Sequence, residues 1–270
     1  MQYEPIKKSI GKVVSGSLFM RKLLYFFMDL LLLRTWHVKK ALRNIAADLP
    51  ERANILDAGS GLGQYTWRMS RMNKYWRIKS VDINREQTGN SEEFFLKAGL
   101  GNRVIFQLLD LNELDENEKY NLVLCVDVME HIGDDELVFR NFYNAMIPGA
   151  HLLISTPSDM GGSDVHSETE ESFIDEHVRT GYSIGEISSK LKNAGFSRIE
   201  ARYTYGKPGK LSWKISMKYP VQMLNKSYLF FIILPFYYIV FFPVSLILNL
   251  FDVNTDHKTG TGLIVTAKKN

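Results

Sequence analysis

The first chemical signal in the chain is a glycine-rich segment, Ile55-Leu56-Asp57-Ala58-Gly59-Ser60-Gly61-Leu62-Gly63. Gly59, Gly61 and Gly63 permit a tight turn, and without a Cβ they let the backbone approach a ligand closely. A strand-like apolar run precedes the turn and a helical pattern follows it, so unpaired N–H groups at the helix start would face a polar ligand. A lone glycine-rich segment also fits a simple tight turn, so its meaning depends on the residues around it.

Acidic residues at the ends of successive strand-like segments strengthen that signal. Asp82 lies 25 residues after Asp57, where an acidic residue of a nucleotide-binding Rossmann fold accepts hydrogen bonds from ribose hydroxyls. Asp110 follows the next such segment, where a carboxylate could accept from the adenine amine. Each alone fits a loop-capping carboxylate, but the three together favour a nucleoside site.

Four motifs occur in order along the chain: Asp57-x-Gly-x-Gly-x-Gly, Val-Asp82-Ile, Leu-Asp110-Leu and Asp127-Val-Met-Glu-His-Ile. Over residues 53–196 and the last strand, the chain resembles class I S-adenosylmethionine-dependent methyltransferases. Among these it is most similar to small-molecule enzymes such as the ubiquinone and menaquinone biosynthesis methyltransferases. The rival nicotinamide-binding fingerprint, Gly-x-Gly-x-x-Gly, spaces its glycines differently.

The resemblance implies an α/β, Rossmann-like fold with a seven-stranded, mostly parallel sheet whose last strand is antiparallel. It implies S-adenosylmethionine as cofactor and S-adenosylhomocysteine as product. The implied cofactor site places Asp57, Gly59, Gly61 and Gly63 around the methionine moiety, Asp82 at the ribose, and Asp110 with Leu111 at the adenine. Ile83 and Asp127 are further cofactor-binding candidates.

Methyl transfer from a sulfonium is an in-line displacement, so the protein mainly positions the nucleophile and excludes water. A hydroxyl nucleophile also needs a base, and histidine suits neutral pH. We therefore select His131 and His177 as candidate catalytic residues, although either fits a structural loop histidine, and Arg179 and Tyr182 as substrate contacts. A carbon or thiol acceptor needs no dedicated base. No metal is predicted, because Asp134-Asp135 fits a helix N-terminus.

Alternation of strand and helix patterns predicts the elements that position these residues. The predicted strands are 54–57, 77–82, 104–109, 122–127, 151–156, 198–205 and 263–268. The predicted helices are 64–72, 91–98, 135–146 and one from Ser183 to Gly195, with a turn at 147–150. The domains are an N-terminal helical cap at 1–50, a core at 51–206, an insertion at 207–258 and the last core strand at 259–270. A cleaved signal is the weaker alternative to the cap.

The insertion has an unusual composition. Residues 201–251 contain no Asp or Glu, and 228–251 form the most apolar run of the chain, with Pro235 and Pro243 as expected breaks. Five lysines precede that run: Lys207, Lys210, Lys214, Lys218 and Lys226. We expect contact with an anionic membrane surface, rather than a lid or a dimer surface, and hence a small lipophilic acceptor and O-methylation more than C-methylation.

Two other function classes remain as alternatives. A degenerate, cofactor-binding scaffold at the membrane is disfavoured by the intact motifs. A nucleic-acid methyltransferase ranks last, because no Asn-Pro-Pro-Tyr-type motif follows the fourth strand and the net charge is only +3. The single cysteine, Cys125, allows no internal disulfide and suits a reducing cytosol, so we expect a cytoplasmic protein at the inner face of the membrane.

Overall fold

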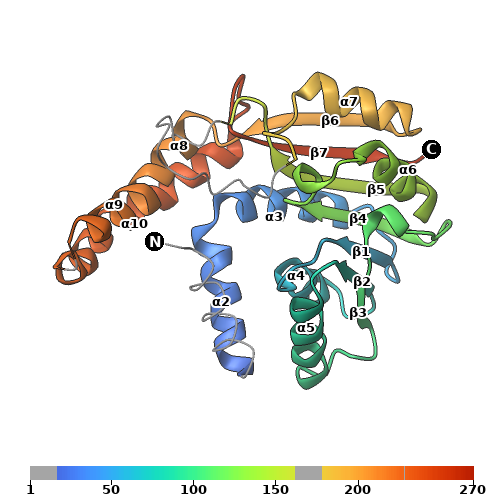
Figure 1. Cartoon of the computed structure of the whole chain (residues 1–270), viewed down its shortest axis with the longest axis horizontal. Coiled ribbons are helices and arrows are strands. Elements are labelled where there is room, and N and C mark those ends of the chain that lie inside the picture. Colours follow the sequence, from blue (N-terminus) through green and yellow to red (C-terminus); the bar gives the residue numbers. More distant parts are fainter. Residues whose placement is uncertain (1–16, 162–177, 228) are drawn as a thin grey trace.

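A seven-stranded sheet forms the centre of the protein (Figure 1). The computed structural model describes residues 17–161, 178–227 and 229–270. The strands are β1 (Asn54–Ala58), β2 (Arg77–Asp82), β3 (Val104–Leu108), β4 (Tyr120–Val126), β5 (Met146–Pro157), β6 (Ser197–Thr204) and β7 (Gly262–Lys268). Their order is β3-β2-β1-β4-β5-β7-β6. Pairing is parallel from β3 to β5, whereas β7 is antiparallel to both its neighbours, which confirms the predicted sheet.

Helices cover both faces of the sheet, as its near-continuous apolar strands require. One hydrophobic core joins the sheet to α6 (Asp135–Ala145) and α7 (Ile184–Asn193). A second core, on the other face, includes residues of α3 (Leu33–Ala46), α4 (Gln64–Met72) and α5 (Arg85–Lys97). Short helical turns, η1 (Leu111–Glu113) and η2 (Met129–His131), follow β3 and β4.

Two predicted boundaries were wrong. Helix α6 ends at Ala145 and β5 already begins at Met146, so the expected turn at 147–150 lies inside a strand. Met146 pairs with Tyr120 across a register shift, and Gly149 takes a positive φ of 81° within that irregular stretch. Helix α5 begins at Arg85, earlier than predicted, because Asn84 caps it by accepting a hydrogen bond from the Gln87 N–H.

The direction of β6 determines where the insertion leaves the core. Because β5 and β6 both run antiparallel to β7, they are parallel to each other. Thr204, the last residue of β6, pairs with Gly262, and Gly262 pairs with Pro157 at the carboxyl end of β5. The insertion between β6 and β7 therefore starts and returns at the edge where the parallel strands end.

The insertion folds as a hairpin of helices that projects from the core (Figure 1). Its first arm consists of α8 (Lys207–Trp213), a π-helical segment η3 (Lys214–Lys218) and α9 (Tyr219–Lys226). Its second arm is α10 (Phe230–Asn254), which runs back antiparallel to the first. We call residues 207–254 the helical hairpin.

The expected breaks at Pro235 and Pro243 were wrong, since α10 is continuous through both. Between the two prolines, Tyr237 and Tyr238 donate hydrogen bonds to the carbonyl oxygens of Ile215 (2.7 Å) and Ser216 (3.0 Å) in η3. These cross-arm contacts hold α10 against η3 between the two positions where proline removes an intrahelical hydrogen bond.

Candidate functional site

The glycine loop is held tightly against β2 and the residues after β4. The N–H groups of Gly59 and Ser60 both donate to the Val81 carbonyl at 2.9 Å. Gly59 has a φ of 76°, and a Cβ there would lie 2.1 Å from a Val128 methyl. Both observations require glycine at this position.

Asp82 ends β2 and contacts the same loop. Its carboxylate accepts hydrogen bonds from the Gly61 N–H at 2.7 Å and from the Asn84 N–H at 2.8 Å. Ile83, the next residue, is 74% exposed although it is a large aliphatic side chain. The structure therefore brings the Asp82 carboxylate to the glycine loop, and the exposed Ile83 follows it directly in the chain.

Asp110 and Leu111 follow the adjacent strand, β3. The Asp110 carboxylate accepts from the backbone and side-chain N–H groups of Asn112, both at 2.9 Å. Leu111 is buried in the core beneath. Because β3, β2, β1 and β4 are parallel neighbours, these residues share the carboxyl edge of the sheet with the glycine loop.

Asp57 lies inside the protein, in β1 just before the loop. It is buried and accepts a hydrogen bond from the Thr66 hydroxyl in α4, which also contacts the Ser80 hydroxyl at 2.9 Å. Burial raises the pKa of the Asp57 carboxyl to about 7, an effect that the Thr66 hydrogen bond only partly opposes. Burial therefore favours the neutral form of this carboxyl.

Asp127 follows β4 and is held by the N-terminal cap. It adopts a φ of 51°, unusual for a residue other than glycine, and forms an ion pair with Arg34 of α3. The backbone N–H of Arg34 donates to the Tyr205 hydroxyl at 2.9 Å. No local sequence pattern marks Arg34 or Tyr205 as site residues, because the contacts join segments far apart in the chain.

The N-terminal cap also covers the glycine loop. In α2 (Leu18–Leu31), Arg21 is buried and donates to the Leu62 carbonyl and to the Ser91 hydroxyl, each at 2.7 Å. Tyr25 donates to the same Leu62 carbonyl. These contacts place α2 directly over one side of the loop, where it would limit access of water.

The candidate catalytic residues have different positions. His131 lies in η2, after β4, and is exposed, with its backbone N–H bonded to the Val128 carbonyl. His177 lies outside the described residues. Glu130, which was not among the predicted site residues, lies between Asp127 and His131, is buried and accepts from the Thr156 hydroxyl at 3.1 Å. Burial raises the pKa of the Glu130 carboxyl.

Arg179 and Tyr182 belong to a cluster around Asp135. Both bind Asp135 at the start of α6, with the Tyr182 hydroxyl donating to its carboxylate at 2.7 Å. Lys190 forms a further ion pair with Asp135 at 2.8 Å. Burial alone would raise the pKa of Asp135, but the hydrogen bonds from Lys190 and Tyr182 and the charge of Arg179 hold it below its usual value. This cluster connects α6, α7 and the chain before α7. The contact of Arg179 and Tyr182 with a substrate stays a prediction.

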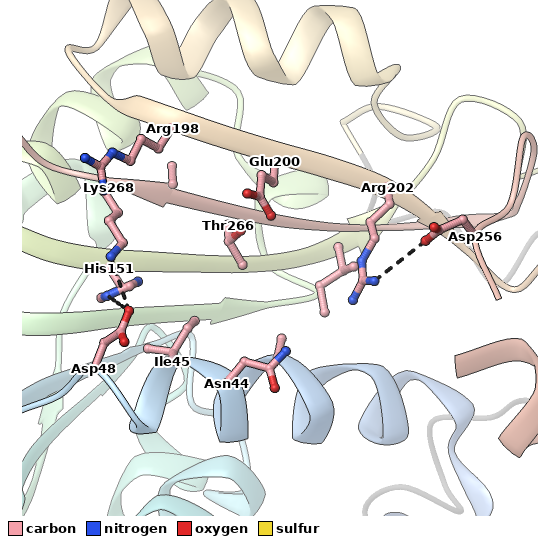
Figure 2. Close-up of a pocket in the computed structure, with 13 residues that line it drawn as sticks. Asn44, Ile45, Asp48, His151, Arg198, Glu200, Arg202, Asp256, Thr266 and Lys268 are labelled. Atoms are coloured by element: carbon pink, nitrogen blue, oxygen red, sulfur yellow. Dashed lines mark hydrogen bonds and ion pairs between the residues drawn. The ribbon is translucent and has the colours of Figure 1, made fainter. Parts of the chain in front are cut away.

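Two cavities lie outside the glycine loop. The larger, of about 610 Å³, runs between α3 and strands β6 and β7 and is lined by charged groups of both signs, as Figure 2 shows. Among them, Asp48 contacts His151 at 3.5 Å and Lys268 at 3.3 Å. None of the predicted cofactor residues lines this cavity.

The smaller cavity, of about 160 Å³, lies where the helical hairpin meets the cap, and we call it the root pocket. It is lined by Leu31, Leu32, Leu33, Arg34, Tyr205, Ser212, Trp213, Ser216, Met217 and Asn249. Arg34 thus contributes to the root pocket and also pairs with Asp127. Within the described parts of the chain, no group of three or more His, Cys, Asp or Glu side chains could hold a metal ion.

Comparison with known proteins agrees with this geometry. A ubiquinone biosynthesis O-methyltransferase of Proteus mirabilis is 24% identical over 102 residues, which cover 38% of this chain and 41% of that protein. A 27-O-demethylrifamycin SV methyltransferase of Amycolatopsis mediterranei is 26% identical over 158 residues, covering 56% of this chain and 57% of that protein. The matched segment therefore covers only about half of the length of each of these two relatives.

Solved structures share the fold. Phosphoethanolamine N-methyltransferase 2 of Haemonchus contortus, in complex with S-adenosyl-L-methionine, matches with a TM-score of 0.61 and 17% identity over 87% of this chain and 52% of that one. A putative sarcosine dimethylglycine methyltransferase of Galdieria sulphuraria has a TM-score of 0.57 and 20% identity over 87% and 84% of the two chains. A family model for a methyltransferase domain matches residues 33–201, more than half of the sequence. The chain therefore belongs to the methyltransferase domain family.

Proposed function

We propose that the protein is an S-adenosylmethionine-dependent methyltransferase that acts on a small lipophilic acceptor at an anionic membrane surface, with O-methylation favoured over C-methylation. The observation that carries the enzymatic part is the contact between the Asp82 carboxylate and the Gly61 N–H. It joins the glycine loop to the acidic end of β2 within a fold of the methyltransferase family.

The residues around the loop fit S-adenosylmethionine. Ser60 has a buried hydroxyl without a hydrogen-bond partner among the described residues, and a ligand could supply one. The exposed aliphatic surface of Ile83 suits contact with a nucleoside. Asp82 would hold the ribose, Asp110 and Leu111 would frame the adenine, and the loop with Asp127 would surround the methionine moiety. Asp57 would support the loop from behind.

When bound, the cofactor supplies an electrophilic methyl group, so the protein needs to orient the acceptor and accept a proton. Helix α2 excludes water from one side of the loop through Arg21 and Tyr25. His131 remains the proposed base for a hydroxyl acceptor. The buried Glu130 is a second candidate for the base that accepts this proton. Burial raises its pKa, and a carboxylate with a raised pKa is a stronger base than an exposed one.

Surface chemistry supports membrane docking through the helical hairpin. By length and composition α10 could cross a membrane, and only 11% of its most apolar window is buried within the molecule. Large apolar side chains are exposed along its outer side, among them Phe231, Ile232, Phe236, Ile239, Val240 and Ile247. A soluble core helix would instead bury such residues.

The inner side of the helical hairpin has the opposite character. Ser212 donates to the Ser245 carbonyl at 3.0 Å, and Ser216 donates to the Ser212 carbonyl at 2.8 Å. Gly209, Ser212 and Ser216 occur at intervals of three and four residues along the first arm. Small and polar residues between helices with apolar outer surfaces are typical of helices packed in lipid.

The charge and position of the helical hairpin fit a surface location. Lys207, Lys210, Lys214 and Lys218 follow one another at helical spacing, which places them along one side of the first arm. Such a row favours anionic lipid headgroups. Both ends of the helical hairpin return to the sheet edge that carries the glycine loop, so a single crossing is excluded, and docking would turn the cofactor site towards the lipid. We propose the inner, cytoplasmic face.

Two measurements test the proposal. Calorimetric titration should show S-adenosylmethionine binding to the purified protein, and a dinucleotide binding in its place would refute the enzymatic assignment. Sedimentation with phosphatidylglycerol vesicles should carry the protein into the pellet, whereas a variant with residues 230–251 replaced by a short Gly-Ser linker should stay in the supernatant. Quantitative recovery of the wild-type protein in the supernatant would instead indicate a lid or a dimer surface.

A further inference from the structure

The root pocket contains an unexplained polar group. Asn249 is 3% exposed and lines the pocket, and its Oδ1 atom has no hydrogen-bond partner among the described residues. A buried amide oxygen without a partner destabilises the folded protein. The adjacent residues of α10, Leu248 and Leu250, are aliphatic and similar in size to asparagine, so the polar side chain of Asn249 is an exception in this part of the helix.

A complementary donor lies among the other residues that line the pocket. Arg34 lines the same pocket, and its Nε–H is also buried without a partner in the described part of the chain. The remaining walls include Leu31, Leu32 and Trp213. The pocket therefore combines one free acceptor and one free donor with an apolar lining.

We propose that the root pocket binds the un-ionised hydroxyl end of a lipid-soluble alcohol or phenol, and that Asn249 determines this specificity. A hydroxyl can donate to Asn249 Oδ1 and can also accept from Arg34 Nε. The volume of about 160 Å³ admits one ring or the end of a chain, not a whole lipid. This inference rests on the proposed function, in which such a molecule is the methyl acceptor.

The location of the pocket fits that role. Its walls come from the cap and from both arms of the helical hairpin, the part that would contact the membrane. Arg34 lines the pocket and also forms an ion pair with Asp127, the residue that follows β4, so a single side chain connects the pocket with that residue. An acceptor leaving the bilayer along the helical hairpin would therefore reach the pocket before the methyl group.

A small probe can test the pocket without knowledge of the natural acceptor. We would titrate the full-length protein with 4-bromophenol and with 4-bromoanisole, which lacks the hydroxyl donor, and follow quenching of Trp213 fluorescence by bromine. The phenol should quench saturably and bind about tenfold more tightly than the anisole, as expected for one buried hydrogen bond. Trp213→Phe should remove the saturable component and identify the reporting residue.

Variants of Asn249 separate specificity from folding. Asn249→Leu should abolish the preference for the phenol, whereas Asn249→Asp, which keeps an acceptor, should retain it. Asn249→Leu should also raise the midpoint of thermal unfolding by about 2–4 °C, because it removes a buried polar group without a partner. Asn225→Leu, an exposed asparagine of the same helical hairpin, should change neither result.

The outcomes distinguish this inference from the proposed function. Equal affinity for phenol and anisole, or an unchanged preference in Asn249→Leu, would overturn the assignment of the root pocket even if S-adenosylmethionine binds normally. A preference for the phenol that depends on Asn249 would support it even if calorimetry showed no S-adenosylmethionine binding, which would refute only the enzymatic assignment.

Discussion

At the scale of single residues, the carboxyl edge of the sheet holds acidic side chains in contrasting environments. Asp82 accepts from the Gly61 N–H of the glycine loop and from the Asn84 N–H at the start of α5, while Asp57 is buried behind the loop against Thr66. The same residue type therefore serves as a loop contact in one place and as an internal hydrogen-bond acceptor in the other.

Substitution of Asp82 should weaken cofactor binding through two effects. Asp82→Ala removes the acceptor for Gly61 N–H and the proposed ribose contact, so affinity for S-adenosylmethionine should fall at least tenfold, about 1.4 kcal/mol. Asp82→Asn, which keeps an acceptor oxygen for the loop, should lose less. Calorimetry measures both, with the exposed Asp256→Ala as control. Unchanged affinity in Asp82→Ala would show that β2 does not contribute to the cofactor site.

Substitution of Asp57 should change the pH dependence of stability. Its pKa is raised from 3.8 to about 7 in the folded protein, so the folded state binds more protons between those values. Proton binding by Asp57 therefore stabilises the folded state at low pH, and this stabilisation is lost as the pH rises from 3.8 towards 7. Asp57→Asn, which stays neutral and can still accept from Thr66, should become more stable relative to wild type between pH 5 and pH 8.

Urea unfolding at pH 5 and pH 8 measures that difference. The stability of Asp57→Asn relative to wild type should rise by a few kcal/mol between the two pH values, an order-of-magnitude expectation for a shift of this size. A difference that is the same at both pH values would mean that the Asp57 carboxyl is ionised in the folded protein.

At the scale of elements, the helical hairpin is fixed to the core by one buried carboxylate near the end of α10. Asp252 accepts hydrogen bonds from His37 of α3 at 2.8 Å, from the Tyr205 N–H at 3.1 Å and from the Gly209 N–H at 2.8 Å. A Cβ on Gly209 would lie 2.6 Å from that carboxylate, so glycine permits the close approach of α8 to α10. The angle at which the helical hairpin leaves the core therefore depends on this residue.

Loss of Asp252 should destabilise the protein strongly. Asp252→Ala leaves His37 and two buried N–H groups without an acceptor, so the free energy of unfolding should fall by about 3 kcal/mol. Urea denaturation measures it. The neighbouring Asp256 is almost fully exposed, and Asp256→Ala should stay within about 0.5 kcal/mol of wild type. Similar values for the two variants would contradict the anchoring role of Asp252.

The elements differ in how well the sequence predicts them. Strands such as β1 and β4 were predicted closely because both sheet faces are covered and most of their residues are apolar and buried. The start of β5 was predicted wrongly, because Pro148-Gly149 normally indicates a turn. Only the pairing of Met146 with Tyr120 makes this segment part of a strand. The continuity of α10 likewise depends on contacts across the helical hairpin that no local pattern encodes.

The candidate site shows the same division. The glycine loop, Asp82 and Asp110 follow a spacing that the sequence displays, and the structure brings them to one edge. The pairing of Asp127 with Arg34 and the binding of Arg179 and Tyr182 to Asp135 join residues 44 or more positions apart. Such partners are determined by tertiary packing, so a single sequence could not indicate them.

At the scale of the whole molecule, the helical hairpin projects from the core (Figure 1). Many of its large apolar side chains are exposed. The exposed face of α2 adds Phe19, Phe26 and Phe27. We expect these exposed side chains, rather than the core, to control where the protein resides.

Charged substitutions on the outer side of α10 should separate docking from folding. Phe236→Asp combined with Ile239→Asp, at positions that are 68% and 72% exposed, should abolish sedimentation with phosphatidylglycerol vesicles, because each charge would have to enter the lipid interface. The unfolding midpoint should hardly change, since neither side chain is buried in the protein. Leu96→Asp, at an exposed apolar position on α5, is the matched control and should sediment normally. Sedimentation of the double variant would exclude α10 as the docking surface.

The return of the helical hairpin to the glycine-loop edge would have a kinetic consequence if the protein docks on a membrane as proposed. A protein docked on the membrane through the helical hairpin would meet its acceptor by lateral diffusion within the bilayer. Turnover would then depend on the mole fraction of acceptor among the lipids and not on its concentration in the whole solution. Adding inert lipid at constant acceptor would then slow the reaction by surface dilution, while S-adenosylmethionine would continue to arrive from the aqueous side.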